Sequence, residues 1–216
     1  MKLYVYEYCP YCIKARMIFP LKGIPCELAL LLDDDVATPS QMIGHKLLPI
    51  LQKEDGTYMG ESMDIVRYVD QLPDAPRCLM RERRPEIARW CQEMEYTVFR
   101  LAMPRWIDMP VHEFSTPGAR AYYRRGKEAW LGRFKTLISQ TPQLLDEVHD
   151  ELAQLAELMA GPDTVNEALS EDDIAVFALL HQLSTVKGVR YPTLVETYRQ
   201  RMAARTTLPL YDAHAI

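Results

Sequence analysis

The sequence lacks the features that mark several common classes of protein. It contains no run approaching the roughly 18 apolar residues that a membrane-spanning helix needs. Its first residues show no apolar block of the signal-peptide kind. With a net charge of −5, it has no excess of basic residues for nucleic acid. We therefore expect neither a membrane nor a nucleic acid among its partners.

Cysteine and histidine are sparse and scattered. There are five cysteines, an odd number without the spacing of a secreted disulfide framework, so a reducing cytoplasmic setting is expected. Cys26, Cys78 and Cys91 stand alone, and none of the five histidines is close to another in sequence. A tetrahedral zinc site needs two further closely spaced ligands beside a CxxC pair. The spacing therefore disfavours zinc, and we expect no metal.

What the sequence does contain is a CxxC motif, Cys9-Pro10-Tyr11-Cys12, directly after the strand-like residues 2–6. A CxxC pair where a strand leads into a helix is typical of redox-active dithiols. Proline suits the first turn of a helix, where its missing N–H has no partner to lose. The motif thus places Cys9 at the N-cap, with the backbone N–H groups of Tyr11 and Cys12 facing its sulfur.

This placement favours a thiolate at Cys9. A free cysteine has a pKa of about 8.5. The positive end of a helix dipole stabilises the anion, and helix-start CxxC motifs reach pKa values of roughly 3.5 to 7. We expect Cys9 to be the attacking sulfur and Cys12 the resolving one. A purely structural disulfide is disfavoured, because so small a loop would cross-link little of the chain.

The first part of the chain is predicted to alternate short strands and helices in the order β-α-β-α-β-β-α. A crossover helix makes the first two strands parallel, and the turn signal Glu54-Asp55-Gly56 predicts an antiparallel hairpin. The nearly continuous apolar run 26–31 predicts an interior position beside the first strand. The predicted strands are 2–6, 26–31, 48–51 and 57–59, and the predicted helices are 10–21, 39–46 and 61–71.

Beyond the proline-rich segment 72–76 only helices and loops are predicted. We expect a first domain over 1–72, a linker over 73–83 and an all-helical domain over 84–216. Pro104 is expected to interrupt a first helix, and Pro192 to open the last one. Ser170 and Asp173 form a capping pattern before residues 174–183, which are apolar on most faces and predict a central buried helix.

Taken together, these segments resemble the bacterial glutaredoxin 2 family, whose members are glutaredoxins built on the glutathione-transferase fold. The likeness runs the whole length of the chain. The resemblance implies a thioredoxin-like βαβαββα domain followed by an all-helical C-terminal domain. It rests on CPYC at 9–12, KARMIF at 14–19, LP at 48–49, ESMDIV at 61–66 and LSEDDI at 169–174.

The resemblance implies a cytoplasmic, monomeric, glutathione-dependent thiol–disulfide oxidoreductase. Such an enzyme reduces protein disulfides and glutathione mixed disulfides through a redox-active Cys9–Cys12 pair, with glutathione as co-substrate and disulfide-bonded or glutathionylated proteins as partners. The alternative is a glutathione transferase that conjugates glutathione to electrophiles. Transferases with a cysteine at the helix start generally lack the second cysteine, so CPYC favours the oxidoreductase.

The resemblance also implies a glutathione site formed by Tyr11, Leu48, Pro49, Glu61 and Ser62. Pro49 would follow a cis peptide bond, which proline tolerates, and leave the backbone of Leu48 to bind the cysteinyl part of glutathione. Ser62, at a helix N-terminus, would bind the γ-glutamyl carboxylate and Glu61 its ammonium group. From the residues alone, Pro49 fits a proline on an edge strand equally well. Ordinary helix capping by Ser62, with Glu61 exposed to solvent, is the favoured interpretation of that pair when it is taken alone.

One position departs from the pattern of the small glutaredoxins. Many of them carry a lysine shortly before the motif, which holds the glycine carboxylate of glutathione, whereas this chain has Glu7 and Tyr8 there. His45 or Lys46, just before the Leu-Pro pair, is the substitute that the sequence offers.

Overall fold

The computed structural model describes residues 1–73, 75–80 and 83–216. The chain divides into two compact units, the first formed by Met1–Arg77 and Ile107–Gly126 and the second by Cys78–Trp106 and Lys127–Ile216. Asp74, Arg81 and Glu82, which belong to the predicted linker, lie outside the described residues.

A four-stranded sheet forms the centre of the first unit. Its strands are β1 (Lys2–Val5), β2 (Glu27–Leu30), β3 (Ile50–Gln52) and β4 (Tyr58–Met59), in the order β2-β1-β3-β4. β1 is parallel to β2 and antiparallel to β3, and β3 and β4 form the antiparallel hairpin, as predicted.

The prediction that the 26–31 run lies inside the sheet is wrong, because β2 is an edge strand. It does lie beside β1, but Glu27 and Leu28 are exposed. The Glu27 carboxylate forms an ion pair with Lys2 Nζ at 2.7 Å. The apolar residues of a short strand indicate that part of the strand is covered by other elements. They do not fix how many neighbouring strands it has in the sheet.

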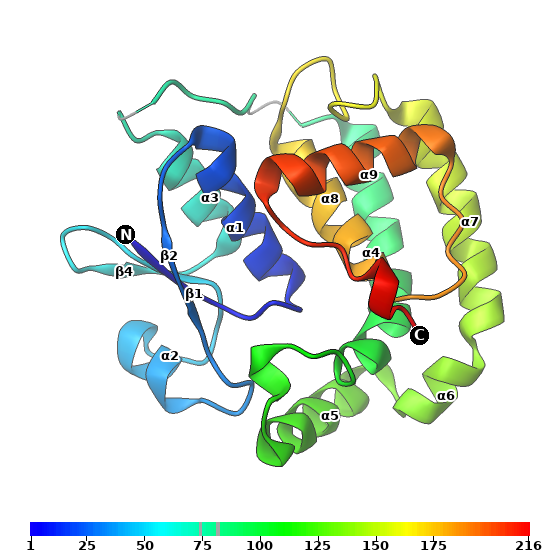
Figure 1. The fold of residues 1–216 in the computed structure, drawn as a ribbon, viewed down its shortest axis with the longest axis horizontal. Coiled ribbons are helices and arrows are strands. Elements are labelled where there is room, and N and C mark those ends of the chain that lie inside the picture. Colours follow the sequence, from blue (N-terminus) through cyan, green and yellow to red (C-terminus); the bar gives the residue numbers. More distant parts are fainter. Residues whose placement is uncertain (74, 81–82) are drawn as a thin grey trace. The chain divides into compact units, whose positions relative to one another are not determined.

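Three helices pack on this sheet. They are α1 (Pro10–Lys22), α2 (Ala37–Ile43) and α3 (Ser62–Asp70). α1 and α3 lie side by side, and α2 lies on the other side of the strands (Figure 1). α1 ends at Gly23, whose φ of 70° is the left-handed conformation that glycine adopts at a helix end. Lys22 Nζ donates to the carbonyls of Asp70 and Leu72, which ties the end of α1 to the end of α3.

The segment Ile107–Gly126 groups by its contacts with the first unit, although the predicted boundaries assign it to the helical domain. It contains the 3₁₀ turn η1 (His112–Phe114) and the first part of α5 (Pro117–Leu131). The rings of Phe114 and Tyr123 pack on the Tyr8 ring with centroids 5.1 and 5.0 Å away, so this segment completes an aromatic core beside the CxxC motif.

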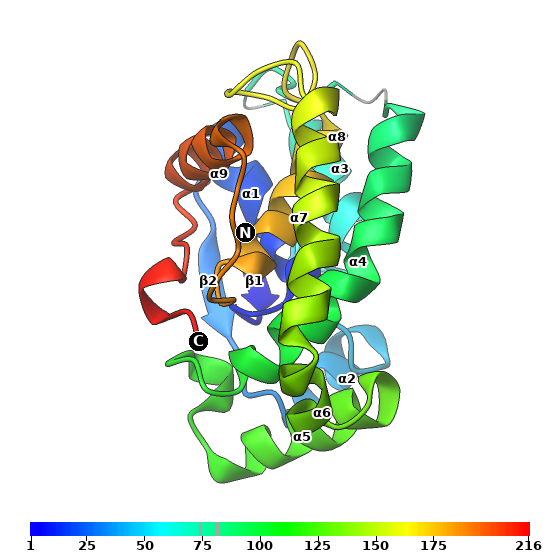
Figure 2. The ribbon, with the colours of Figure 1, turned by 90° about the vertical axis from the view of Figure 1, so that its right-hand side faces the viewer.

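The second unit is helical around α8 (Glu171–Leu183), all of whose residues are buried. α4 (Pro85–Trp106) and α9 (Thr193–Thr206) pack on α8, while α7 (Thr141–Leu158) runs alongside α4 (Figure 2). The short helix α6 (Phe134–Ser139) and the 3₁₀ turn η2 (Asp212–His214) complete it. The predicted central buried helix is therefore confirmed. No helix within the described residues is long and apolar enough to cross a bilayer.

Two prolines in this unit show when a proline in the sequence predicts a helix boundary. Pro192 lies at the N-cap of α9, which confirms that it opens the last helix. α4, in contrast, continues past Pro104 to Trp106, so the predicted interruption is wrong. Pro104 lies so near the helix end that it removes only one backbone hydrogen bond from an otherwise well-packed helix.

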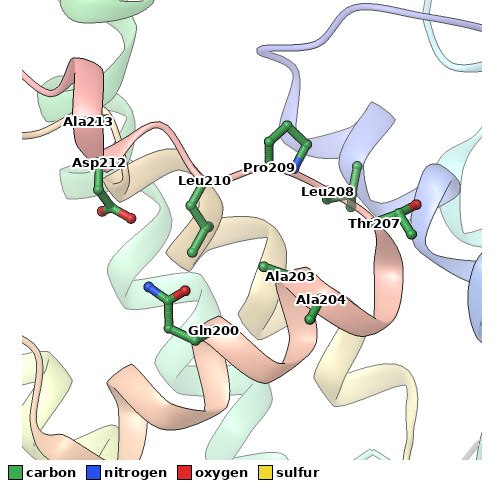
Figure 3. A pocket seen from close by; sticks show the side chains of 9 residues that line it. All are labelled: Gln200, Ala203, Ala204, Thr207, Leu208, Pro209, Leu210, Asp212 and Ala213. Atoms are coloured by element: carbon green, nitrogen blue, oxygen red, sulfur yellow. The ribbon is translucent and has the colours of Figure 1, made fainter.

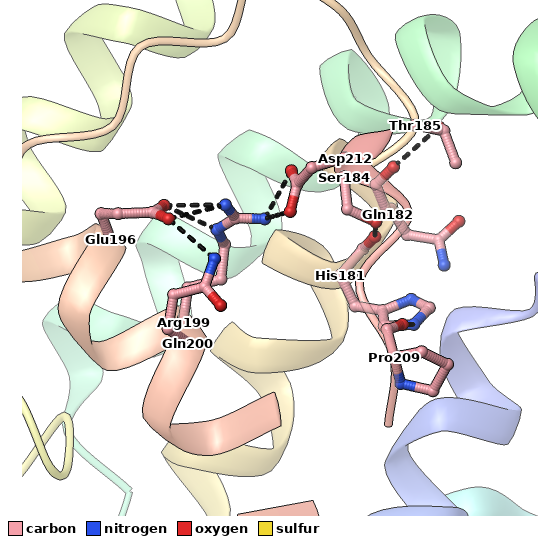
Figure 4. Close-up of polar contacts among 9 residues, drawn as sticks. All are labelled: His181, Gln182, Ser184, Thr185, Glu196, Arg199, Gln200, Pro209 and Asp212. Carbon is pink, nitrogen blue, oxygen red and sulfur yellow. Dashed lines mark hydrogen bonds and ion pairs between the residues drawn. The ribbon is translucent and has the colours of Figure 1, made fainter. Parts of the chain in front are cut away.

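Polar side chains anchor both ends of α8. At its start, the Ser170 N–H and hydroxyl donate to Asp173 Oδ2 at 2.8 and 3.0 Å, which confirms the predicted capping box. Near its end, the Gln182 side chain accepts from Trp106 Nε1 at 2.9 Å. The segment after α9 is held by Arg199, whose guanidinium bridges Glu196 and Asp212 (Figure 4).

Candidate active site

The CxxC motif lies where the sequence places it, at the junction of β1 and α1. Cys9 is the N-cap of α1 with an extended backbone (φ −78°, ψ 122°), and its carbonyl accepts the first helical bond from Ile13 N at 2.9 Å. Pro10 occupies the first helical position. Cys9 is 9% exposed and Cys12 is fully buried, and neither forms a disulfide in this structure. Cys9 is thus the less buried residue of the pair.

One detail of the prediction differs. The Cys9 side chain makes no capping hydrogen bond to the amides of the first turn of α1, so the expected bonds from Tyr11 and Cys12 N–H do not form in the described structure. Cys9 nevertheless lies at the positive end of α1, where the helix dipole favours a negative charge without requiring a direct bond.

Cys12 is held in a different environment from Cys9. Its Sγ accepts a hydrogen bond from Tyr6 N at 3.4 Å. Burial, together with the hydrogen bond to Cys9 and the negative charge there, raises the pKa of the Cys12 thiol well above its ordinary value. A buried thiol beside a thiolate keeps its proton. The arrangement therefore favours one negative charge on the pair, located at Cys9.

The chain just before Cys9 is fixed by two acidic residues that sequence reasoning missed. Tyr8 N donates to Glu113 Oε1 at 2.8 Å, and the Tyr8 hydroxyl donates to Asp33 Oδ1 at 2.8 Å. Asp33 N in turn donates to the Glu113 carbonyl at 3.1 Å. No short-range sequence pattern connects residues so distant along the chain. The signal was a lone acidic residue between the apolar Val111 and Phe114, a pattern too common to select Glu113.

The residues predicted to bind glutathione all lie in the first unit. The Leu48–Pro49 peptide bond is cis, which confirms that prediction, and both residues are buried. Ser62 is the buried first residue of α3, preceded by the exposed Glu61. Tyr11 is 42% exposed, with Lys14 Nζ 5.1 Å from its ring centroid.

Glu61 has an unusual backbone. Its φ of 62° with ψ of 110° is a conformation that residues with a side chain rarely adopt. Such conformations tend to occur where the surrounding structure holds a binding residue in place. The Glu61 carbonyl accepts the first hydrogen bond of α3 from Ile65 N at 3.0 Å, so Glu61 is the residue at which the chain turns into the helix.

The two proposed substitutes for the missing lysine differ. His45 is exposed. Lys46 Nζ donates to the backbone carbonyl of Asp33 and lies 4.0 Å from the Tyr122 ring centroid. Lys46 is therefore already engaged within the first unit, whereas the His45 side chain extends toward solvent.

Two further features of the described residues bear on catalysis. They include no group of three or more His, Cys, Asp or Glu side chains that could hold a metal ion. A pocket of about 760 Å³ lies on α9 and the segment after it (Figure 3). Its one titratable lining residue, Asp212, is ion-paired with Arg199 at 2.8 Å, so the pocket offers no free acid, base or nucleophile.

Comparison with known proteins covers the whole chain. The family model "Glutaredoxin 2, C terminal domain" matches residues 86–215, and "Glutathione S-transferase, N-terminal domain" matches residues 3–77. Glutaredoxin 2 of Escherichia coli strain K12 is 47% identical over 216 residues, which cover 100% of both chains.

Solved structures agree. Glutaredoxin 2 from Salmonella typhimurium, in complex with glutathione, has a TM-score of 0.96 at 47% identity, covering 100% of this chain and 98% of that one. Glutathione transferase GSTFuA3 from Phanerochaete chrysosporium has a TM-score of 0.76 at 17% identity, covering 94% of this chain and 96% of that one, and shows the fold alone. The predicted fold class, a thioredoxin-like domain followed by a helical domain, is confirmed.

Proposed function

The chain belongs to the glutaredoxin 2 family, and on that premise we propose that Cys9 and Cys12 carry its glutathione-dependent thiol–disulfide exchange. The enzyme is a glutathione-dependent oxidoreductase. The observation that supports these roles is the asymmetry of the dithiol. Cys12 is fully buried with a raised pKa, whereas Cys9 lies at the helix start and is the less buried of the two.

In the dithiol route, the Cys9 thiolate attacks one sulfur of a protein disulfide. A Cys9–target bond forms, and the other target sulfur leaves as a thiolate that takes up a proton. Cys12 then gives up its proton and attacks the Cys9 sulfur, which releases the second target thiol and leaves the Cys9–Cys12 disulfide. One glutathione opens this disulfide at Cys9 and a second releases oxidised glutathione, so two glutathiones supply the two electrons.

In the monothiol route, Cys9 attacks the glutathione sulfur of a glutathionylated protein. The protein thiol leaves, and a second glutathione thiolate attacks the Cys9–glutathione bond to regenerate Cys9. This route does not use Cys12. The Cys9–Cys12 couple should have a potential in the range of about −200 to −230 mV that is typical of glutaredoxins.

The glutathione site is proposed to be formed by Tyr11, Leu48, Pro49, Glu61 and Ser62. Ser62 supplies a hydroxyl and a backbone N–H at the start of α3, a location that favours a carboxylate. Glu61 supplies the opposite charge for an ammonium group. The support from relatives is the Salmonella typhimurium structure, which contains glutathione.

Disulfide-bonded or glutathionylated proteins are the proposed partners, and a monomer in the cytoplasm is the proposed state and setting. The support for the setting is the odd number of cysteines, which lack the spacing of a secreted disulfide framework.

A glutathione-coupled reductase assay tests the assignment of the two cysteines. Cys9→Ser should abolish reduction of both a protein disulfide and a glutathione mixed disulfide. Cys12→Ser should abolish the first activity and retain the second, since only the dithiol route needs a resolving thiol. Cys26→Ser is the matched control and should leave both activities unchanged. Residual mixed-disulfide reduction by Cys9→Ser, or loss of this activity in Cys12→Ser, would contradict these roles. If the wild-type protein conjugates glutathione to an aryl halide faster than it reduces a mixed disulfide, the transferase is favoured instead.

A further inference from the structure

Glu113 is a fully buried carboxyl beside the motif that the exchange reaction leaves without a role. Its side chain is 0% exposed. Oε1 accepts from Tyr8 N at 2.8 Å, while Oε2 has no hydrogen-bond partner among the described residues. A buried carboxyl oxygen without a hydrogen-bond partner is costly and calls for an explanation.

The contacts of Glu113 act directly on the segment that positions Cys9. Its carboxyl holds the N–H of Tyr8, the residue immediately before Cys9, and its carbonyl holds Asp33 N at 3.1 Å. Asp33 closes the ring by accepting from the Tyr8 hydroxyl at 2.8 Å. A parallel link joins the preceding residues, because His112 N donates to Glu7 Oε2 at 3.3 Å.

Glu113 and Cys9 share a neighbouring side chain, that of Tyr123. The charges of both Glu113 and Cys9 act on the Tyr123 hydroxyl. Burial raises the pKa of Glu113 to about 7, helped by the charge of Glu7 and opposed by the bond from Tyr8 N. The titratable and charged groups around it are Glu7, Tyr8 and Cys9 before α1, Asp33 and Lys46 around α2, His112 on η1, and Arg120 and Tyr123 on α5.

We propose that Glu113 is a positioning residue for Cys9, and that its ionisation is coupled to the ionisation of the Cys9 thiol. The carboxyl fixes the backbone where the chain enters α1. Two negative charges in one buried neighbourhood disfavour each other, so the Cys9 thiolate forms more readily while Glu113 keeps its proton. Such coupling is reciprocal, so the thiolate raises the pKa of Glu113 by the same factor. The inference rests on the proposed role of Cys9 as the nucleophile.

The first test is the pH profile of Cys9 alkylation by iodoacetamide, measured in a Cys12→Ser background. With Glu113 present, the rate should follow two ionisations. Glu113→Gln keeps an oxygen that can accept from Tyr8 N and removes the charge, so one ionisation should remain, at a lower pH. Glu113→Ala also removes the acceptor, and the rate should fall about tenfold at all pH values through misplacement of Cys9. Glu7→Gln is the control and should keep both ionisations.

A second test needs neither turnover nor the alanine variant, which can fail to fold. The side-chain carboxyl carbons are labelled with ¹³C, and the Glu113 signal is assigned by its loss in Glu113→Gln. Its titration midpoint should be higher in Cys12→Ser, where Cys9 is a thiolate, than in Cys9→Ser.

Three outcomes would contradict parts of the proposal. Equal midpoints, or an alkylation profile that Glu113→Gln leaves unchanged, would overturn the coupling. A wild-type rate in a folded Glu113→Ala would overturn the positioning role. If instead Cys9→Ser retains reductase activity, the proposed function fails, and the Glu113 titration still measures the coupling.

Discussion

Two residues three positions apart can have opposite chemical roles when the fold treats their side chains differently. Cys9 is the N-cap residue of α1 and keeps a small exposed fraction, whereas Cys12 is fully buried and accepts from Tyr6 N. A helix start favours the anion, and desolvation favours the neutral thiol. The two effects have opposite signs, so the first deprotonation of the pair is directed to Cys9.

Glu113 also leads to a prediction about stability. Its pKa is raised from an ordinary 4.5 to about 7, so between these values the folded protein binds a proton that the unfolded chain has lost. Stability therefore falls as pH rises through that window, by about 3 kcal/mol from this group. Glu113→Gln does not titrate, and its stability relative to wild type should increase by about that amount from about pH 4 to about pH 8.

Urea unfolding of both proteins across this range measures the difference, in which the titration of all other groups largely cancels. Asp163→Asn, which replaces an exposed carboxylate of the second unit, serves as the control for the loss of a carboxylate away from Glu113. A difference between Glu113→Gln and wild type that stays constant with pH would show that Glu113 ionises normally.

At the scale of elements, the start of α8 illustrates how one buried carboxylate organises several backbone segments. Asp173 accepts from Ser170 N and from Val165 N, each at 2.8 Å, and from the Tyr198 hydroxyl at 3.2 Å. It thereby connects the helix cap, the preceding loop and α9. The Ser170 hydroxyl donates to it as well, so removing the acceptor leaves four donors to be satisfied elsewhere.

We therefore expect Asp173→Ala to lower the free energy of unfolding by about 3 kcal/mol or more. The matched control is Asp163→Ala, which removes an exposed carboxylate that pairs with Arg201 at 2.8 Å and should cost less than about 1 kcal/mol. Chemical denaturation compares the two variants. Equal losses would mean that burial at Asp173 adds nothing to its hydrogen bonds.

The elements also show which predictions a sequence supports. The CxxC helix start, the Glu54-Asp55-Gly56 turn and the capping box depend on neighbours a few residues apart, and all three are present. The edge position of β2 depends on the order of strands in the sheet, which apolar composition does not encode. The links of Tyr8 to Asp33 and Glu113 join segments 25 and 105 residues apart, so no local pattern revealed them.

For the whole molecule, the contacts divide the chain in a way that its linear order does not suggest. The first unit consists of Met1–Arg77 together with Ile107–Gly126. The second segment supplies the Glu113 carboxyl to Tyr8 N, and the rings of Phe114 and Tyr123 to the Tyr8 ring. The thioredoxin-like part thus depends on residues from beyond α4 for its core beside the active site.

A fragment of residues 1–77 should accordingly fail to fold stably, because it leaves the Tyr8 ring without its aromatic partners and the Tyr8 N–H without its acceptor. Amide dispersion in NMR spectra and near-ultraviolet circular dichroism test this. In the intact chain, Phe114→Ala removes part of the same core and should cost about 3–5 kcal/mol, since Phe114 is fully buried. A well-dispersed fragment with mixed-disulfide reductase activity would show that residues 1–77 form an autonomous domain. The aromatic contacts from 107–126 would then adjust the active site without being needed to build it.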